Sequence, residues 1–328
     1  MAIRLEPIDE YMHELGPEPN FNESMYFNVF DPSSQMGGFL RLGNRANEGQ
    51  AEMTVCLYLP DGRVAFMFQR PKISDNNSFD AGGVRFNVVR PFEELEASYE
   101  GKVLLLDDPL CMKDPRAAFT NNPTADARVS LTFTGLSPMF GGEPDEAHES
   151  TGEEFARGHY EQLVGGIGRI EVGDQSWDID GFGLRDHSWG PRYWQAPWYY
   201  RWLTGNFGPS FGFMASRVAR RDGPGTRGGF VWDGTGLRLC HHVEVSTRWR
   251  GEDAYHDTIT AELQSGDQKW RIEGKVLSLI PLRNRRDEMV TRISEGLTRW
   301  TTQDDKVGYG LSEYLDQIID GRPVGIDE

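Results

Sequence analysis

Residues 183–192 read Gly-Leu-Arg-Asp-His-Ser-Trp-Gly-Pro-Arg, and this is the most informative stretch of the chain. It combines two arginines, an acid, an imidazole, a hydroxyl and an indole. The interior of a strand or helix does not need that mixture, whereas acid–base chemistry beside an apolar ligand does. Residues 177–183 are typical of a strand that runs into the motif. Residues 193–202 add large aromatic side chains, which indicates burial or contact with a ligand.

Strand signals separated by turn signals extend outward from this motif in both directions. Residues 51–59 and 64–69 flank a Pro-Asp-Gly turn at 60–62, as expected of a hairpin. Residues 128–135 alternate polar and apolar side chains, as a half-buried strand does. Together with 38 glycines and 12% aromatic residues, this pattern predicts an all-β protein.

The length of 328 residues suits one large or two ordinary domains. Both halves carry many short strands, so we expect two packed antiparallel barrels or sandwiches, over residues 1–150 and 151–328. The acidic residues 141–154 lack periodicity and are the expected linker or lid. Residues 310–319 place apolar side chains three and four apart, which predicts a short C-terminal helix.

The formal net charge of −17 argues against nucleic acid or an anionic membrane surface as the main partner, because phosphate binding needs clustered Lys and Arg. No apolar run is long enough to span a bilayer and no signal peptide is recognised, so we expect a cytoplasmic protein. Cys56, Cys111 and Cys240 are odd in number and far apart, which favours reduced thiols over a disulfide framework or a zinc site. Exposed edges of two barrels would permit a homodimer.

Asp186 and His187 are adjacent, so their side chains point to opposite faces if the segment is a regular strand. A bulge or turn would be needed before the two could form one catalytic pair. His187 is a candidate proton-transfer group, or else a member of a hydrogen-bond network. Asp186 is a candidate catalytic acid, or else a buried carboxylate paired with Arg185 or Arg192.

A second group of candidate catalytic residues lies near the N-terminus. Glu23 is expected to act as a general acid or base if the barrel buries it and raises its pKa, with Tyr26 beside it. The alternative is an ordinary turn carboxylate. The candidate substrate-binding residues are arginines able to hold a developing anion and tryptophans able to line a pocket or fill a core: Arg185, Trp189, Arg192, Trp194, Trp198 and Arg201. For Arg201 the alternative is pairing with a core acid.

A metal site is considered at His241, His242 and Glu244. His242 and Glu244 share one face of a strand, and His256 is a conceivable third ligand, but the spacing matches no standard zinc pattern. We therefore expect no metal. The phosphate-binding pattern G-x-x-x-x-G-K-[ST] is also absent.

The Gly-x-Arg-Asp-His-Ser-Trp-Gly-x-Arg motif, entered from a strand and followed by Trp-rich sequence, resembles the AttH and carotenoid 1,2-hydratase group of lipocalin-like proteins. Tocopherol cyclase and fungal Diels–Alderases are more distant relatives of that group. Residues 22–28 and 308–314 look similar to a bacterial branch of it. The resemblance implies two consecutive lipocalin-like β-barrels. It also implies reactions without a cofactor, namely addition or removal of water, cyclisation or pericyclic closure on bulky apolar substrates.

We therefore expect a cofactor-independent lyase or hydratase, or an isomerase or cyclase, that acts on a bulky hydrophobic or aromatic small molecule. A terpenoid, a steroid-like ring system or an aromatic catabolite would fit an aromatic-lined cavity. The alternative is a non-catalytic lipocalin-like carrier of an apolar metabolite, in which Asp186 and His187 are structural. Fold alone does not decide between the two.

Overall fold

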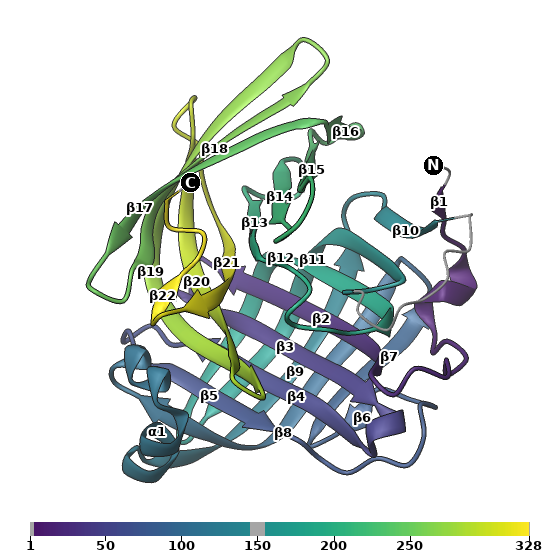
Figure 1. The fold of residues 1–328 in the computed structure, drawn as a ribbon, viewed down its shortest axis with the longest axis vertical. Helices are drawn as coiled ribbons and strands as arrows, with labels where there is room; N and C mark the ends of the chain where they lie inside the picture. The colour runs from purple at the N-terminus through teal and green to yellow at the C-terminus, as the bar shows by residue number, and fades with distance from the viewer. Residues whose placement is uncertain (1–2, 145–154, 328) are drawn as a thin grey trace. The chain divides into compact units, whose positions relative to one another are not determined.

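The structure is a computed structural model that describes residues 3–144 and 155–327. In this part of the chain the strands form two large antiparallel sheets, one of 12 strands and one of 10 (Figure 1). The chain divides into two compact units, Met1–Asp107 with Asn121–Tyr193, and Asp108–Thr120 with Trp194–Glu328. The expectation of an all-β protein is confirmed.

The first unit contains a closed barrel. The ladder runs β11–β12–β2–β3–β4–β5–β8, and β9 pairs with both β8 and β11, so the sheet returns to its starting strand. The elements of this unit are β1 (Ile3–Arg4), η1 (Pro7–Glu10), β2 (Phe21–Asp31), β3 (Met36–Arg45), η2 (Ala46–Glu48), β4 (Gln50–Tyr58), β5 (Val64–Gln69), β6 (Asp80–Ala81), β7 (Val84–Arg90), β8 (Glu94–Leu106), β9 (Thr124–Gly135), β10 (Phe140–Pro144), β11 (Gly158–Val172) and β12 (Gln175–Pro191).

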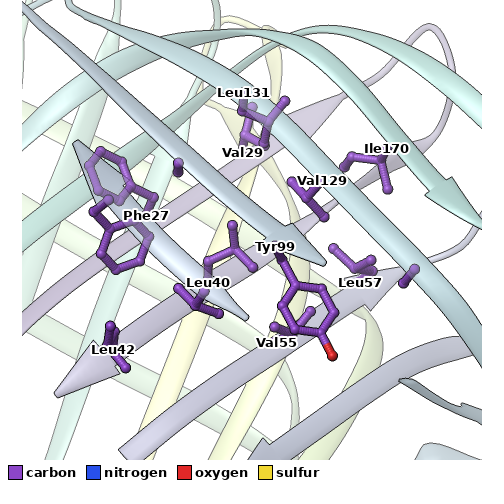
Figure 2. Packing of buried hydrophobic residues seen from close by; sticks show 14 of the residues in the cluster. Phe27, Val29, Leu40, Leu42, Val55, Leu57, Tyr99, Val129, Leu131 and Ile170 are labelled. Carbon is purple, nitrogen blue, oxygen red and sulfur yellow. The ribbon is translucent and has the colours of Figure 1, made fainter. Parts of the chain in front are cut away.

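Apolar side chains fill the interior of this barrel. Phe27 and Val29 of β2 pack against Leu40 of β3 and Val55 of β4, and Figure 2 shows these side chains converging with others of the same cluster. Alternate residues of a strand point to opposite faces, so Tyr26, which lies between inward-facing residues, faces outward. Burying each large apolar side chain stabilises the fold by about 1.5–3 kcal/mol.

The strands β12 and β2 lie unusually close where the 183–192 motif begins. A Cβ atom on Gly183 would lie 1.8 Å from the Asn28 carbonyl oxygen, so a side chain there would push the strands apart. Beyond Gly183 the pairing continues without a register shift from Arg185 to Pro191. This register places His187 opposite Met25 and Trp189 opposite Glu23.

Strands β11 and β12 belong to the first sheet because β12 pairs with β2. The two units consequently divide after Tyr193, whereas the sequence pattern led us to place the boundary after residue 150. Residues 140–144 of the expected linker form β10, which pairs with β11. Residues 145–154, the rest of the expected linker or lid, lie outside the described residues.

The second unit is one sheet that curves around its own core. Apolar residues of its end strands, Cys240 of β16 and Val243 of β17, share one cluster with Leu203 and Trp300. Within residues 194–327 no ladder joins β16 to β17, so the predicted second barrel is a curved open sheet. Its elements are η3 (Pro109–Lys113), α1 (Pro115–Asn121), β13 (Tyr199–Asn206), β14 (Gly212–Ala219), β15 (Thr226–Trp232), β16 (Leu237–Cys240), β17 (His242–Arg250), β18 (Tyr255–Ser265), β19 (Gln268–Arg286), β20 (Met289–Thr302), β21 (Val307–Ile319) and β22 (Arg322–Pro323).

The predicted C-terminal helix is wrong, because residues 310–319 lie in strand β21. This strand pairs with β13 on one side and β20 on the other. Leu311, Ser312, Tyr314 and Leu315 are all buried, so both faces of the strand are covered. Covering both faces removes the polar–apolar alternation that marks a half-exposed strand, and the remaining apolar positions happen to fall at helical spacing. Among the described residues no helix is long and apolar enough to cross a membrane.

Candidate functional site

Two of the predicted catalytic residues meet inside the first unit. His187 of β12 and Glu23 of β2 are fully buried, and Nε2 of His187 lies 2.6 Å from Oε1 of Glu23. Both side chains point to the inner side of the barrel, in register with the core residue Met25. A short contact between an imidazole and a carboxylate is the arrangement that tunes a histidine for proton transfer.

The segment before β2 contributes a second imidazole to Glu23. Nδ1 of His13 lies 2.9 Å from Oε1 of Glu23, and the backbone N–H of His13 donates to Oε2 at 3.0 Å. Asn76 donates to the same Oε2 at 3.4 Å. The His13 ring stacks on Trp189 with centroids 3.9 Å apart. Glu23 is therefore surrounded by hydrogen-bond donors.

The same arm, through η1, supplies the partner of the buried Arg185. The two carboxylate oxygens of Glu10 accept hydrogen bonds from Nη1 and Nη2 of Arg185 at 2.7 and 2.8 Å. The Tyr160 hydroxyl and the Phe92 backbone N–H also donate to Glu10, at 2.5 and 2.7 Å. Burial alone would raise the pKa of Glu10, but the Arg185 guanidinium outweighs burial and lowers it. The Tyr160 oxygen also lies 3.4 Å from Nδ1 of His187, which links the two parts of the cluster.

The pKa of Glu23 contradicts the sequence-based expectation. Burial by itself would raise the pKa of Glu23, as we expected, but hydrogen bonds from His13 and His187 outweigh burial and lower it to about 2. Glu23 is consequently a carboxylate near neutral pH and a weak base. Its hydrogen bonds orient the two imidazoles.

Aromatic rings surround the His187 imidazole. The ring centroids of Phe79, Tyr160 and Trp189 lie 5.5, 5.6 and 5.5 Å from it, all with steep interplanar angles. These rings exclude water from one side of the imidazole and strengthen its interaction with Glu23. Trp189, a predicted binding residue, therefore lies within the cluster.

Asp186 and Tyr26, the other two predicted catalytic residues, lie on the opposite face of the same strands. They are directly opposite each other in the β12–β2 ladder, and no bulge in β12 turns Asp186 inward. The Tyr26 hydroxyl accepts a hydrogen bond from Asn28 at 3.3 Å, and its ring stacks on Phe39. Asp186 and His187 thus do not form a pair, as strand alternation requires.

The remaining predicted binding residues fall outside the cluster. Arg192 donates to the Ser188 hydroxyl at 2.6 Å and lies over the Phe155 ring. Burial, together with the nearby Arg41 guanidinium, lowers the pKa of Arg192 to about 9.

Trp194, Trp198 and Arg201 belong to the second unit. Arg201 makes a bidentate ion pair with the buried Asp316, at 3.0 and 3.1 Å, so it pairs with a core acid. The backbone carbonyl of Trp194 accepts from Gln317, and Trp198 packs beneath the Arg221 guanidinium.

The histidines considered as metal ligands in the second unit do not form one site. His242 and Glu244 lie 3.7 Å apart and are half exposed, whereas His256 is buried against Ser312 and stacks on Tyr314. In the described part of the chain, the His, Cys, Asp and Glu side chains that could share an ion are His13, Glu23 and His187, whose ligand atoms all lie within 4.8 Å of one another.

Sequence reasoning missed His13, Glu10 and Tyr160. His13 and Glu10 lie in a polar arm without periodicity, and they are recognised only from their contacts with Glu23 and Arg185. Residues 208–212, Gly-Pro-Ser-Phe-Gly, fit the G-x-S-x-G pattern of a nucleophile elbow, which sequence reasoning wrongly took to be absent. They form the turn between β13 and β14 with Ser210 exposed, so the strand–turn–helix context of an elbow is missing.

Residues 6–318 match the family model described as Domain of unknown function (DUF7064). The chain belongs to the DUF7064 family. No curated protein sequence matches this DUF7064 chain.

Solved structures with the same fold include three whose names bear on the resemblance drawn from the motif. A protein named as an AttH of Nitrosomonas europaea has 14% identity and a TM-score of 0.58, with 95% of this chain and 96% of that chain covered. Kievitone hydratase from Nectria haematococca has 9% identity and a TM-score of 0.58, with 95% and 92% covered. CghA with Sch210972 has 12% identity and a TM-score of 0.54, with 95% of each chain covered. The predicted resemblance to AttH-like, lipocalin-type proteins is confirmed at the level of the fold.

Proposed function

We propose that this DUF7064 protein is an acid–base enzyme of the hydratase or lyase type, with His187 as the group that transfers the proton. The observation that carries the proposal is the 2.6 Å contact between His187 and the buried carboxylate of Glu23. A shared fold with a protein named kievitone hydratase supports this reaction class without identifying a substrate.

In the proposed mechanism Glu23 stays ionised and His187 cycles between imidazole and imidazolium. The low pKa of Glu23 favours this division, because a carboxylate with a pKa of about 2 does not hold a proton near neutral pH. As imidazolium, His187 delivers a proton to an unsaturated substrate. As imidazole, it removes a proton from water in the hydration direction. In the elimination direction it removes a proton from the carbon next to the one that loses the leaving group, so that the double bond forms between the two carbons as the leaving group departs with the bonding electrons. Glu23 orients the ring and stabilises its positive charge.

The proposed substrate is a hydrophobic or aromatic small molecule. The rings of Phe79, Tyr160 and Trp189 around His187 favour a flat or apolar ligand over a highly charged one. Arg185 does not serve as a free anion-binding group in this scheme, because Glu10 neutralises it.

The test is untargeted mass spectrometry of purified protein incubated with panels of terpenoids, steroids and aromatic compounds. Gain or loss of one water, or of a small carbonyl fragment, identifies hydratase or lyase turnover. His187→Gln should reduce turnover by about 10²–10⁴-fold, the usual contribution of general acid–base catalysis.

Asp186→Asn is the matched control, because it alters the neighbouring residue on the opposite face of β12. It should retain turnover within a few-fold of the wild type. If His187→Gln keeps full turnover while Asp186→Asn loses it, the proposed site is wrong. Retention of an unchanged apolar compound with no turnover on any panel would instead identify a carrier.

A further inference from the structure

We infer that His13, Glu23 and His187 form a binding site for one divalent transition-metal ion, with Zn²⁺ as the best-fitting ion. The site combines two imidazoles and one carboxylate from three separate segments, the N-terminal arm, β2 and β12. Two histidines and one acidic residue are a known ligand set for zinc and for other first-row divalent ions.

The distances fit such an ion after small movements. Zinc lies about 2.0–2.2 Å from nitrogen and oxygen ligands, so its tetrahedral ligand atoms lie roughly 3.3 Å apart. Nε2 of His187 and Nδ1 of His13 lie 2.6 and 2.9 Å from Oε1 of Glu23. Lengthening the contact of His13 by about 0.4 Å and that of His187 by about 0.7 Å, to roughly 3.3 Å, makes room for the ion.

The second observation is the set of groups behind the ligands. A metal-bound histidine usually donates its other ring N–H to an oxygen, which fixes the ring. Nδ1 of His187 lies 3.4 Å from the Tyr160 oxygen, and Nε2 of His13 lies 3.4 Å from Oδ1 of Asp9. Nε2 of His13 is buried without a hydrogen bond of proper geometry, so it can carry the ring proton once Nδ1 binds the ion. Oε2 of Glu23 is already held by Asn76 and the His13 backbone, which leaves Oε1 for the ion.

Binding the ion exchanges one state of the cluster for another. Without it, both imidazoles turn an N–H toward Oε1 of Glu23. With it, both turn a lone pair inward, and the ring protons move to the nitrogens that face Tyr160 and Asp9. The ion therefore competes with the proton for His187, and, if the proposed function is correct, Zn²⁺ inhibits turnover.

The experiment measures metal binding directly and does not depend on turnover. Full-length protein is stripped with a chelator and titrated with Co²⁺, whose visible absorption reports coordination, and Zn²⁺ content is then determined by elemental analysis. We expect one ion per chain. His13→Gln and Glu23→Gln should each weaken binding by more than about 100-fold, because loss of an outer partner alone costs about 10–100-fold. Asp9→Asn should show that smaller loss.

His242→Gln is the control, because it removes a half-exposed histidine that also lies beside a glutamate. It should bind Co²⁺ as the wild type does. His13 lies in the arm before β2, so we expect His13→Gln to leave the barrel folded, and circular dichroism of the variant checks this. Absence of stoichiometric binding by the wild type, or binding unaffected by His13→Gln, overturns the metal site. Metal binding without inhibition of an active enzyme would instead count against the proposed function of His187.

Discussion

Glu23 shows how two environmental effects on one carboxyl oppose each other. Removal from water favours the neutral acid, whereas donated hydrogen bonds favour the anion. The donors win here, since His13 and His187 both contact Oε1. The contribution of such a carboxylate to the free energy of unfolding therefore depends on pH.

Acidification should remove the contribution of ionised Glu23 to the stability of the fold. The pKa of Glu23 is 4.5 in a model compound and about 2 in the fold, so its contribution is complete above pH 4.5 and is lost as pH falls toward 2. The difference corresponds to about 3 kcal/mol. Urea unfolding at a series of pH values should show that the difference in free energy of unfolding between the wild type and Glu23→Gln shrinks as the pH falls. A margin that stays constant across the series would contradict the assignment.

Removing one partner of the Glu10–Arg185 pair should be costly. Both side chains are fully buried, so Arg185→Met leaves an uncompensated carboxylate and should cost about 3–5 kcal/mol. The double variant with Glu10→Met should recover much of the loss. Arg169→Ala, which breaks exposed ion pairs only, should leave the melting temperature unchanged. Equal effects of the single and double variants would mean that charge pairing is unimportant.

Sequence reasoning found the residue types of the site but not their geometry. His187 and Glu23 stood out individually, yet nothing in the sequence sets the register that brings β12 beside β2. The opposite faces of Asp186 and His187 followed from strand alternation alone. His13 escaped because an arm without periodicity gives no indication of its contacts. A raised pKa was the condition for an acid–base role of Glu23, and that condition is not met because hydrogen bonds from His13 and His187 outweigh burial.

Strand β21 shows at the level of elements where periodicity fails. Local spacing favoured a helix, but in the fold the backbone groups of β21 are satisfied by pairing with β13 on one edge and β20 on the other. The hairpin at residues 60–62 was predicted correctly, as β4 and β5 pair directly across it. Its turn residues act locally. Strand β21 also pairs with its neighbour β20, but its other partner, β13 (Tyr199–Asn206), lies far earlier in the sequence.

Gly310 is the residue of β21 that permits its close pairing with β13. A Cβ at this position would lie 2.0 Å from the Thr204 carbonyl oxygen. Gly310→Ala should therefore destabilise the protein by about 1–3 kcal/mol, as overpacking does. Gly236→Ala, where a Cβ meets nothing within 4 Å, is the matched control and should be neutral. Thermal melting of both variants decides the matter; a neutral Gly310→Ala would show that the strands can separate freely.

The two units of the whole molecule are interleaved in sequence. Residues Asp108–Thr120 lie between strands of the first unit but belong to the second. Within the second unit, Leu110 packs against the core cluster, and the Lys113 carbonyl accepts a hydrogen bond from Arg283. The sequence alone does not show that residues 108–120 belong to the second unit, because nothing in so short a segment indicates which core it packs against.

Leu110→Ala should accordingly weaken the second unit. We expect a loss of about 1–2 kcal/mol, below the range for a fully buried leucine because Leu110 is partly exposed. Seven of the nine tryptophans lie in that unit, all but Trp177 and Trp189, so fluorescence-detected unfolding reports mainly on it. The exposed Leu239→Ala is the control. Identical unfolding midpoints for Leu110→Ala and the control would place the 108–120 segment outside the second core.

The contact between Glu10 and Arg185 has a consequence for biosynthesis. The two residues are 175 positions apart, so a ribosome adding about 5–20 residues per second synthesises Arg185 roughly 9–35 s after Glu10. In the folded protein β2 pairs with β3 on one edge and with β12 on the other, and β12 is synthesised last of the three strands, so one edge of β2 has no partner until then. An open strand edge invites pairing with other chains. Translation speed between the two residues therefore sets how long the nascent barrel is exposed to aggregation.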